Sequence, residues 1–293
     1  MKFIKYEIYE ISNKEKNTAK ALKNLNTKET FSKLNKSKIQ EDNIGKFAVP
    51  NCIWQENLII GQLSQTYNIN LIKFKGTSKE EVPIKEEYAN DSKTYFFIDC
   101  SQAQVYIQNR KYQAVELTPS LAIKRIQKVL NANLAPEGNE WILQKTDIKY
   151  DIKEVEKYFR EGFVKSIEFH NIPNLKLEKG TKLHNPRIDL DEALVESWNQ
   201  YSSETVDSVK ITAKKDKSIA KNPIANIGIK LAEQNGGNED KILKGVTIIE
   251  DGYEFTIKTK GNDYLVLPFS DNKKSSCQDN LKKILVYVLK RKL

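Results

Sequence analysis

The stretch Tyr95-Phe-Phe-Ile-Asp-Cys-Ser-Gln-Ala-Gln-Val-Tyr-Ile107 is the clearest structural signal in the sequence. Within residues 95–99, the first four are aromatic or β-branched, which is typical of a buried strand. Residues 105–107 have the same character and follow a polar turn at residues 101–103. Two such runs joined by a short connection predict an antiparallel hairpin.

The sequence on either side of this hairpin predicts further strands and helices. Thr118 followed by Pro119 is typical of a helix start, and the apolar residues after it recur at helical spacing. Strands are expected at residues 2–11, 58–60, 70–74, 141–148, 164–170 and 206–213, and as a meander over 246–269. Helices are expected within 14–46, where a charged tail follows, and at 152–160, 192–201, 223–231 and 279–292. Residues 76–93 are expected to form a polar loop.

These elements predict an α+β fold in which antiparallel β-meanders and helices are segregated, as opposed to a doubly wound sheet. The length of 293 residues suits two domains. We expect an N-terminal α+β domain over residues 1–150 and a C-terminal α+β domain over 151–293 that ends in a basic helix. A boundary between residues 173 and 188 is the alternative.

The composition excludes several classes of protein. The chain is 39% hydrophobic and 30% charged, and no run approaches the roughly 20 apolar residues of a transmembrane helix. The charged residues 1–7 are not typical of a secretory signal, so a cytoplasmic protein is expected. Cys52, Cys100 and Cys277 are odd in number and far apart, which favours reduced thiols.

The net charge of +9 is unevenly distributed. Residues 1–150 carry a net +6, residues 151–204 a net −3 and residues 205–293 a net +6. Positive regions of this kind favour phosphate polyanions as partners. Only five of the 48 basic residues are arginine, the side chain that reads guanine edges, so backbone contact is expected over base recognition. A lysine-rich chain that merely reflects base composition is the alternative.

Motifs of common catalytic sites are absent from the sequence. It has no GxxxxGK[ST] loop, no GxSxG elbow, no GxGxxG after a strand and no CxxC pair. His170 and His184 are its only histidines, which removes most general-base schemes at neutral pH. Cys100 follows an apolar strand and is expected in the core. We therefore expect no cofactor, no metal site and no catalytic residue.

A metal-dependent nuclease is the alternative function that the sequence leaves open. Such chemistry needs carboxylates for Mg²⁺ and a lysine near the attacked phosphate. Asp147-Ile-Lys149, preceded by Glu137 and Glu140, is similar to the D-x-K arrangement of restriction-type sites. Lysine-rich chains produce such triplets by chance, however. Asp189-Leu-Asp-Glu192 is interpreted as an acidic helix start, because first-turn carboxylates favour the helix dipole.

Two basic segments are the candidate binding sites. In the first, strand geometry places Lys210 and Lys214 opposite Val209 and Ile211, and the next lysines precede a helix N-terminus, which favours phosphate. The second is the terminal helix, which has no acidic residue after Asp279. Basic residues there also suit the helix dipole without any ligand. The residues assigned to nucleic-acid binding are Lys210, Lys214, Lys215, Lys217, Lys221, Lys282, Lys283, Lys290, Arg291 and Lys292.

The order of elements resembles a known group of proteins. The hairpin at residues 95–107, a helix, the stretch Val209-Lys-Ile-Thr-Ala-Lys-Lys-Asp-Lys217, another helix and a closing hairpin are similar in layout to phage-exclusion proteins of the Rex A type. The layout also resembles the DNA-binding subunit of the Kiwa defence system. The resemblance implies a two-domain, self-associating protein that binds DNA with little sequence preference and acts with a membrane partner encoded beside it. No diagnostic motif carries it, so no catalytic residue is transferred.

Together these observations predict a protein that binds nucleic-acid backbone, with double-stranded DNA as the expected partner. A homodimer is expected because the terminal helix is apolar on several sides. A role as the sensor of a phage-defence or exclusion system is the hypothesis that the resemblance adds. A metal-dependent nuclease and a protein-binding scaffold with no nucleic-acid role remain the alternatives.

Overall fold

A computed structural model describes residues 1–12, 18–74, 81–88, 93–112, 115–148, 155, 158–159, 163–170, 208–234, 243–250, 253–258, 261–269 and 276–291. Several predictions lie outside these described residues. They are Lys149, His184, Lys292, the acidic helix start at Asp189, the helix over residues 192–201 and most of the helix over 152–160.

The chain divides into two compact units. Unit 1 comprises Met1–Thr146 together with Ser270–Leu293, and unit 2 comprises Asp147–Phe269. The terminal helix therefore belongs to unit 1, whereas the sequence grouped it with the second domain. The reason is the packing of its apolar face, which is described below.

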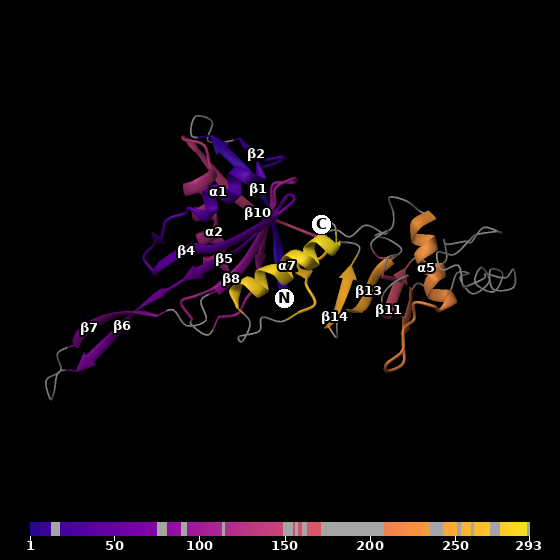
Figure 1. The fold of residues 1–293 in the computed structure, drawn as a ribbon. Coiled ribbons are helices and arrows are strands. Elements are labelled where there is room, and N and C mark those ends of the chain that lie inside the picture. Colours follow the sequence, from indigo (N-terminus) through magenta and orange to yellow (C-terminus); the bar gives the residue numbers. More distant parts are fainter. Residues whose placement is uncertain are drawn as a thin grey trace. The chain divides into compact units, whose positions relative to one another are not determined.

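Unit 1 is built on a large antiparallel sheet with the strand order β10-β1-β9-β8-β5-β4-β3 (Figure 1). A short strand, β2, also pairs with β1. The strands span β1 Lys2–Ser12, β2 Ala19–Ala21, β3 Gln40–Glu41, β4 Lys46–Gln55, β5 Leu58–Gln65, β8 Lys93–Asp99, β9 Gln104–Gln108 and β10 Asn139–Thr146.

The predicted hairpin over residues 95–107 lies in the middle of this sheet. Its strands β8 and β9 pair antiparallel, and they are flanked by β5 and β1. Phe97, Ile98 and Val105 are fully buried, and Ala103 takes a left-handed backbone conformation in the turn. The hairpin prediction and the α+β fold class are both confirmed.

Two helices cover one face of the sheet. Helix α1 spans Thr27–Asn35 and helix α2 spans Pro119–Leu134. As predicted, Thr118 caps α2, since its hydroxyl accepts a hydrogen bond from the backbone N–H of Leu121 at 3.1 Å. The helices pack on strand residues such as Ile59 in β5 and Phe96 in β8. Every second residue of these strands faces the helices, and together with Ile126 of α2 they form one hydrophobic core.

The terminal helix α7, Cys277–Arg291, covers the opposite face of the same sheet (Figure 1). Asn280 donates a hydrogen bond to the Tyr95 hydroxyl at 3.0 Å, and the Cys277 thiol donates to the side chain of Gln62. Tyr95 and Gln62 are register partners on the face away from α1 and α2. The buried side of α7 consists of Asn280, Leu281, Ile284, Leu285 and Val288.

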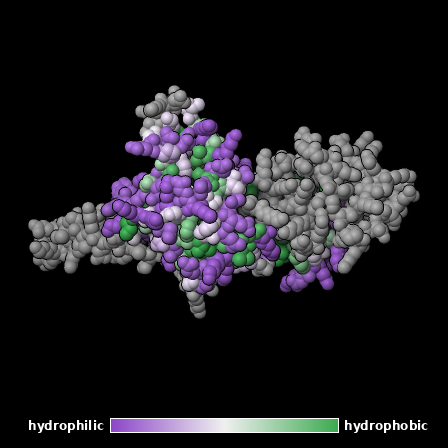
Figure 2. All heavy atoms as spheres, turned by 45° about the horizontal axis from the view of Figure 1, so that its top comes forward, coloured by the Kyte–Doolittle hydropathy of each residue, from purple (hydrophilic) through white to green (hydrophobic). Residues whose placement is uncertain are grey.

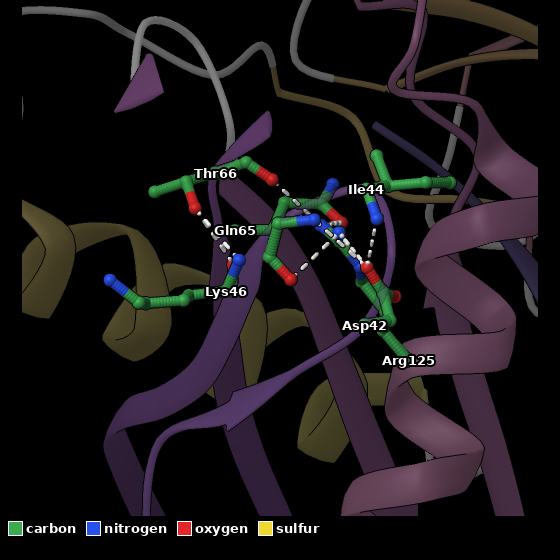
Figure 3. Close-up of polar contacts among 7 residues, drawn as sticks. Asp42, Ile44, Lys46, Gln65, Thr66 and Arg125 are labelled. Atoms are coloured by element: carbon green, nitrogen blue, oxygen red, sulfur yellow. Dashed lines mark hydrogen bonds and ion pairs between the residues drawn. The ribbon is translucent and has the colours of Figure 1, made fainter. Parts of the chain in front are cut away.

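A buried arginine joins α2 to the edge of the sheet (Figure 3). The Arg125 guanidinium donates to both carboxylate oxygens of Asp42, at 3.0 and 2.8 Å, and to the carbonyl of Thr66 at 3.1 Å. It also donates to the Gln65 side chain and the carbonyl of Gly45, so all five N–H groups have acceptors. The turn before β4 is thereby fixed to the end of β5.

Residues 81–88 were expected within a polar loop, and that expectation is wrong. Strand β7, Glu81–Tyr88, pairs antiparallel with β6, Tyr67–Phe74, to form a separate two-stranded sheet. Both strands of such a sheet are edge strands, where a proline such as Pro83 is tolerated.

Unit 2 contains a four-stranded antiparallel sheet with the order β12-β11-β13-β14. Helix α5 packs on one of its faces (Figure 1), and a Cβ added at Gly228 would lie 2.1 Å from the Phe169 ring, so only glycine permits this approach. The elements span β11 Phe163–His170, β12 Ser208–Thr212, α5 Pro223–Gln234, β13 Leu243–Glu250, β14 Tyr253–Lys258 and β15 Leu265–Val266.

Candidate nucleic-acid interface

The face of the unit 2 sheet opposite α5 carries the candidate site. Apolar side chains such as Ile167, Phe169 and Val246 are buried on the α5 side. The register places polar residues on the other side in cross-strand rows, of which one joins Lys210, Glu168, Gly245 and Lys258. We call Lys165, Glu168, Lys210, Lys244, Glu254 and Lys258 the lysine face.

Two β-bulges bring extra lysines to this face. The pairing of β11 with β13 shifts between Val164 and Ser166, which leaves Lys165 as the extra residue on β11. The pairing shifts again further along β11. Glu168 pairs with Gly245 and Phe169 pairs with Leu243, which leaves Lys244 as the extra residue on β13. Strict alternation would turn both lysines toward the apolar side. A bulge re-aims a side chain, and here it permits both to reach carboxylates of the lysine face.

Each lysine at a bulge forms an ion pair across the sheet. Lys244 Nζ lies 2.6 Å from Glu168 Oε1, and Lys165 pairs with Glu254. The side chains of the second pair are 40% and 50% exposed, whereas that of Glu168 is only 27% exposed. Surface pairs of this kind contribute little to stability, so their value for folding alone is small.

A hollow of about 290 Å³ lies between these residues. Gly245 contributes no side chain to the hollow, and other lining residues supply cations and hydroxyl groups. The hollow is lined by Ser166, Glu168, Lys210, Lys244, Gly245, Thr247, Thr256 and Lys258. The described lining residues supply three ammonium groups and one carboxylate, and this excess of positive charge favours an anionic ligand.

Lys210 is the predicted residue that the structure places in the hollow. It is exposed on β12, opposite Glu168 in the register, while Val209 and Ile211 are half-buried. Neither Lys210 nor Lys258 forms an ion pair with any residue in the part of the chain that the structure describes. Both ammonium groups therefore have free hydrogen-bonding capacity toward a ligand.

The lysines after β12 lie in a turn and do not continue the strand. The N–H of Lys217 donates to the carbonyl of Lys214 at 3.0 Å, and Asp216 takes a left-handed conformation. Lys214, Lys215 and Lys217 are all exposed. The Ser218 hydroxyl accepts a hydrogen bond from the N–H of Val164 at 3.0 Å, which anchors the turn to β11. This turn presents three cations, although Lys214 does not share a strand face with Lys210.

The N-terminus of α5 is partly occupied by its own cap. The side-chain oxygen of Asn222 accepts a hydrogen bond from the N–H of Ala225 at 3.1 Å, and its carbonyl accepts from Asn226. Lys221 is exposed immediately before this cap. The expected phosphate position at the helix start therefore has fewer free donors than an uncapped helix would offer.

The second predicted basic segment belongs to unit 1. Lys282, Lys283 and Lys290 are exposed on α7, and Arg291 is the last residue of that helix. Hydrogen bonds from Ser276 lower the pKa of Asp279, and Lys282 and Lys283 lower it further. One apolar side of α7 is buried within the chain, whereas Val286 on another side is 62% exposed. The homodimer remains a prediction.

The residues of the alternative nuclease site are divided between the two units, and Lys149 lies outside the described residues. Glu140 lies in β10 of unit 1, opposite Ile11, whereas Asp147 begins unit 2 and lies beside Gly261. Among the residues that the structure describes, no group of three or more His, Cys, Asp and Glu side chains could hold a metal ion. Glu137 precedes β10. The nuclease therefore remains an untested alternative.

Cys100 lies in the core, as expected from its apolar strand. Its side chain is buried, and burial raises the pKa of the thiol to about 11. Cys52 is also buried, and burial raises the pKa of its thiol to about 12. Both thiols are therefore protonated at neutral pH and are poor nucleophiles.

Comparison with known proteins assigns no family. No protein-family model matches the chain, and a search of curated proteins finds no significant relative. Among the described residues, no helix is both long and apolar enough to cross a membrane. Hydrophilic residues cover most of the described surface in Figure 2, and hydrophobic residues form smaller groups among them.

Proposed function

We propose that the protein binds the phosphate backbone of nucleic acid, first of all double-stranded DNA, with little sequence preference. The observation that carries the proposal is the pair of bulges that directs Lys165 and Lys244 toward the face that bears Lys210 and Lys258. Lysine is a point charge that contacts phosphate without reading bases. The exposed lysines of the turn at 214–217 add further positive charge to unit 2.

The role that fits this activity is the sensor of a phage-defence or exclusion system. The layout resemblance to the Rex A type and to the Kiwa DNA-binding subunit supports it, and it implies a homodimer and a membrane-protein partner. Binding through many weak contacts would gain strength from self-association, because two linked sites act together.

The test is a titration of fluorescently labelled duplex DNA, single-stranded DNA and RNA at two salt concentrations, with and without Mg²⁺. We expect binding that weakens steeply with salt, with the DNA left intact. In the double variant Lys210→Gln with Lys258→Gln, we expect duplex affinity to fall about tenfold or more, since each lost phosphate contact weakens binding.

The matched control is Lys23→Gln with Lys38→Gln, which removes the same charge from exposed positions of unit 1. An equal loss of affinity in the control would show that net charge, and not the lysine face, causes binding. Salt-independent binding, or none at low salt, would refute the proposal and favour the scaffold. Mg²⁺-dependent nicking that Asp147→Ala abolishes would favour the nuclease.

A further inference from the structure

Among the described residues, Glu168 is the one carboxylate that lines the hollow of the lysine face. In the register it lies between Lys210 on β12 and Gly245 on β13. Its carboxylate pairs with Lys244, the lysine that the second bulge brings to this position. A negative charge in the lining of a cationic hollow opposes the binding of an anion there.

The surroundings of Glu168 are suited to phosphate as well as to a carboxylate. The hollow offers hydroxyl groups from Ser166, Thr247 and Thr256, of which the two threonines share a hydrogen bond at 3.0 Å. Hydroxyl and ammonium groups are the donors that proteins use for backbone phosphates. The described part of the lysine face has no aromatic side chain on which a base could stack, which also favours phosphate.

We propose that Glu168 is an internal competitor for phosphate: its carboxylate neutralises Lys244 in the free protein and is displaced from that lysine when a backbone phosphate enters the hollow. The inference rests on the proposed function. It makes Glu168 an affinity-limiting residue of the lysine face, whose loss strengthens binding.

Glu254 provides a matched comparison within the same sheet. It also forms an ion pair with a lysine at a bulge, Lys165, so its neutralisation removes the same charge from the same face. Glu254 does not line the hollow, however, and its side chain is 50% exposed. If only the total charge of the face decided affinity, loss of either carboxylate would strengthen DNA binding equally. Internal competition predicts that loss of Glu168 strengthens DNA binding more than loss of Glu254.

The experiment measures the affinity of wild type, Glu168→Gln and Glu254→Gln for the same duplex DNA at fixed salt. We expect Glu168→Gln to bind about five- to tenfold more tightly, as removal of a like charge a few ångströms from a phosphate implies. We expect Glu254→Gln to change affinity about twofold or less, because solvent screens its more exposed charge. Circular dichroism spectra would establish that both variants are folded.

A double-mutant cycle with Lys244→Gln tests the displacement itself. If Glu168 occupies Lys244 in the free protein, Lys244→Gln costs more affinity in the Glu168→Gln background than in wild type. Equal costs in both backgrounds, or equal tightening by Glu168→Gln and Glu254→Gln, would overturn the inference while the proposed function stands. Wild type that binds no nucleic acid at low salt would refute the proposed function first.

Discussion

Arg125 is a charged residue in a fully buried environment. Its side chain is fully buried, yet each of its N–H groups has an acceptor, and its guanidinium lies 5.1 Å from the centre of the Phe47 ring. An unpaired charge at such a position would be costly, so Asp42 is required as its partner. Gly45 is required as well, because a Cβ there would lie 2.5 Å from the carbonyl oxygen of Thr66.

The ion pair predicts a specific dependence of stability on pH. Burial alone would raise the pKa of Asp42, but hydrogen bonds from Arg125 and from the N–H groups of Gly45 and Ile44 outweigh burial and lower the pKa to about 2. A depressed folded-state pKa stabilises the protein above the ordinary value of 3.8, and this contribution is lost as the pH falls toward 2. We expect a loss of up to about 2 kcal/mol in the free energy of unfolding.

Urea unfolding of wild type and Asp42→Asn between pH 6 and pH 2 checks this prediction. The variant should be less stable at pH 6, because Arg125 loses its counter-charge, and the difference should shrink as the pH falls. Glu29→Gln is the control, since Glu29 forms an exposed pair with Lys33. A difference between wild type and Asp42→Asn that stays constant with pH would contradict the assigned role of the ion pair.

At the scale of elements, the predictions succeeded where the hydrophobic period is regular. The hairpin of β8 and β9 and the capped helix α2 were predicted because alternation and capping are local properties. Strand β4 was missed, since Pro50 interrupts its pattern. The pairing of β4 with β5 shifts between Ala48 and Asn51, so the proline lies within a bulge, where it is tolerated.

The lysine face was predicted only in part for the same reason. Lys210 follows strict alternation and was assigned, whereas Lys165 and Lys244 occupy extra positions that a period of two does not describe. A signal existed, because apolar residues fall at 164, 167 and 169 in β11 and at 243, 246 and 248 in β13. This shared spacing of three and then two indicates a bulge in each strand. Lys258 was missed because it lies apart from the runs of lysine that mark the basic segments.

Helix α7 offers a test of its place in the core of unit 1. Ile284 is fully buried on the helix face that packs on the sheet, whereas Val286, two positions further, is 62% exposed. We expect Ile284→Ala to reduce the free energy of unfolding by about 2–5 kcal/mol and Val286→Ala by less than about 0.5 kcal/mol. Denaturant unfolding measures both. Similar small losses would show that α7 contributes little to the unit.

At the scale of the whole molecule, the predicted basic residues are divided between the two units. Lys214 and Lys215 belong to unit 2, whereas Lys282 and Lys283 belong to unit 1. The sequence could not reveal this division, because the return of the chain to unit 1 depends on packing between residues more than 200 positions apart, such as Gln62 and Cys277.

The division predicts how binding to a long duplex depends on salt. If both units contact phosphates, replacing either lysine pair by glutamine should reduce the slope of log K against log salt by about 0.9 for each lost contact. The combined variant should show both reductions. Titrations at four salt concentrations measure the slopes. An unchanged slope for the Lys282 and Lys283 variant would confine DNA contact to unit 2 and leave the helix dipole as the role of those lysines.

Because α7 follows unit 2 in the sequence but belongs to unit 1, the order of synthesis affects which unit can fold first. Residues 147–269 are made before this helix, so unit 2 can complete its own core while the nascent chain is still growing. Unit 1 begins earlier but must wait, because one face of its sheet stays uncovered until residues 277–291 have left the ribosome. Domains usually fold from the N-terminus onward during translation. Here unit 2, which is synthesised later, is the first that can complete its folding. If the ribosome stalled before α7 was made, the uncovered apolar face of the unit 1 sheet would be exposed to chaperones.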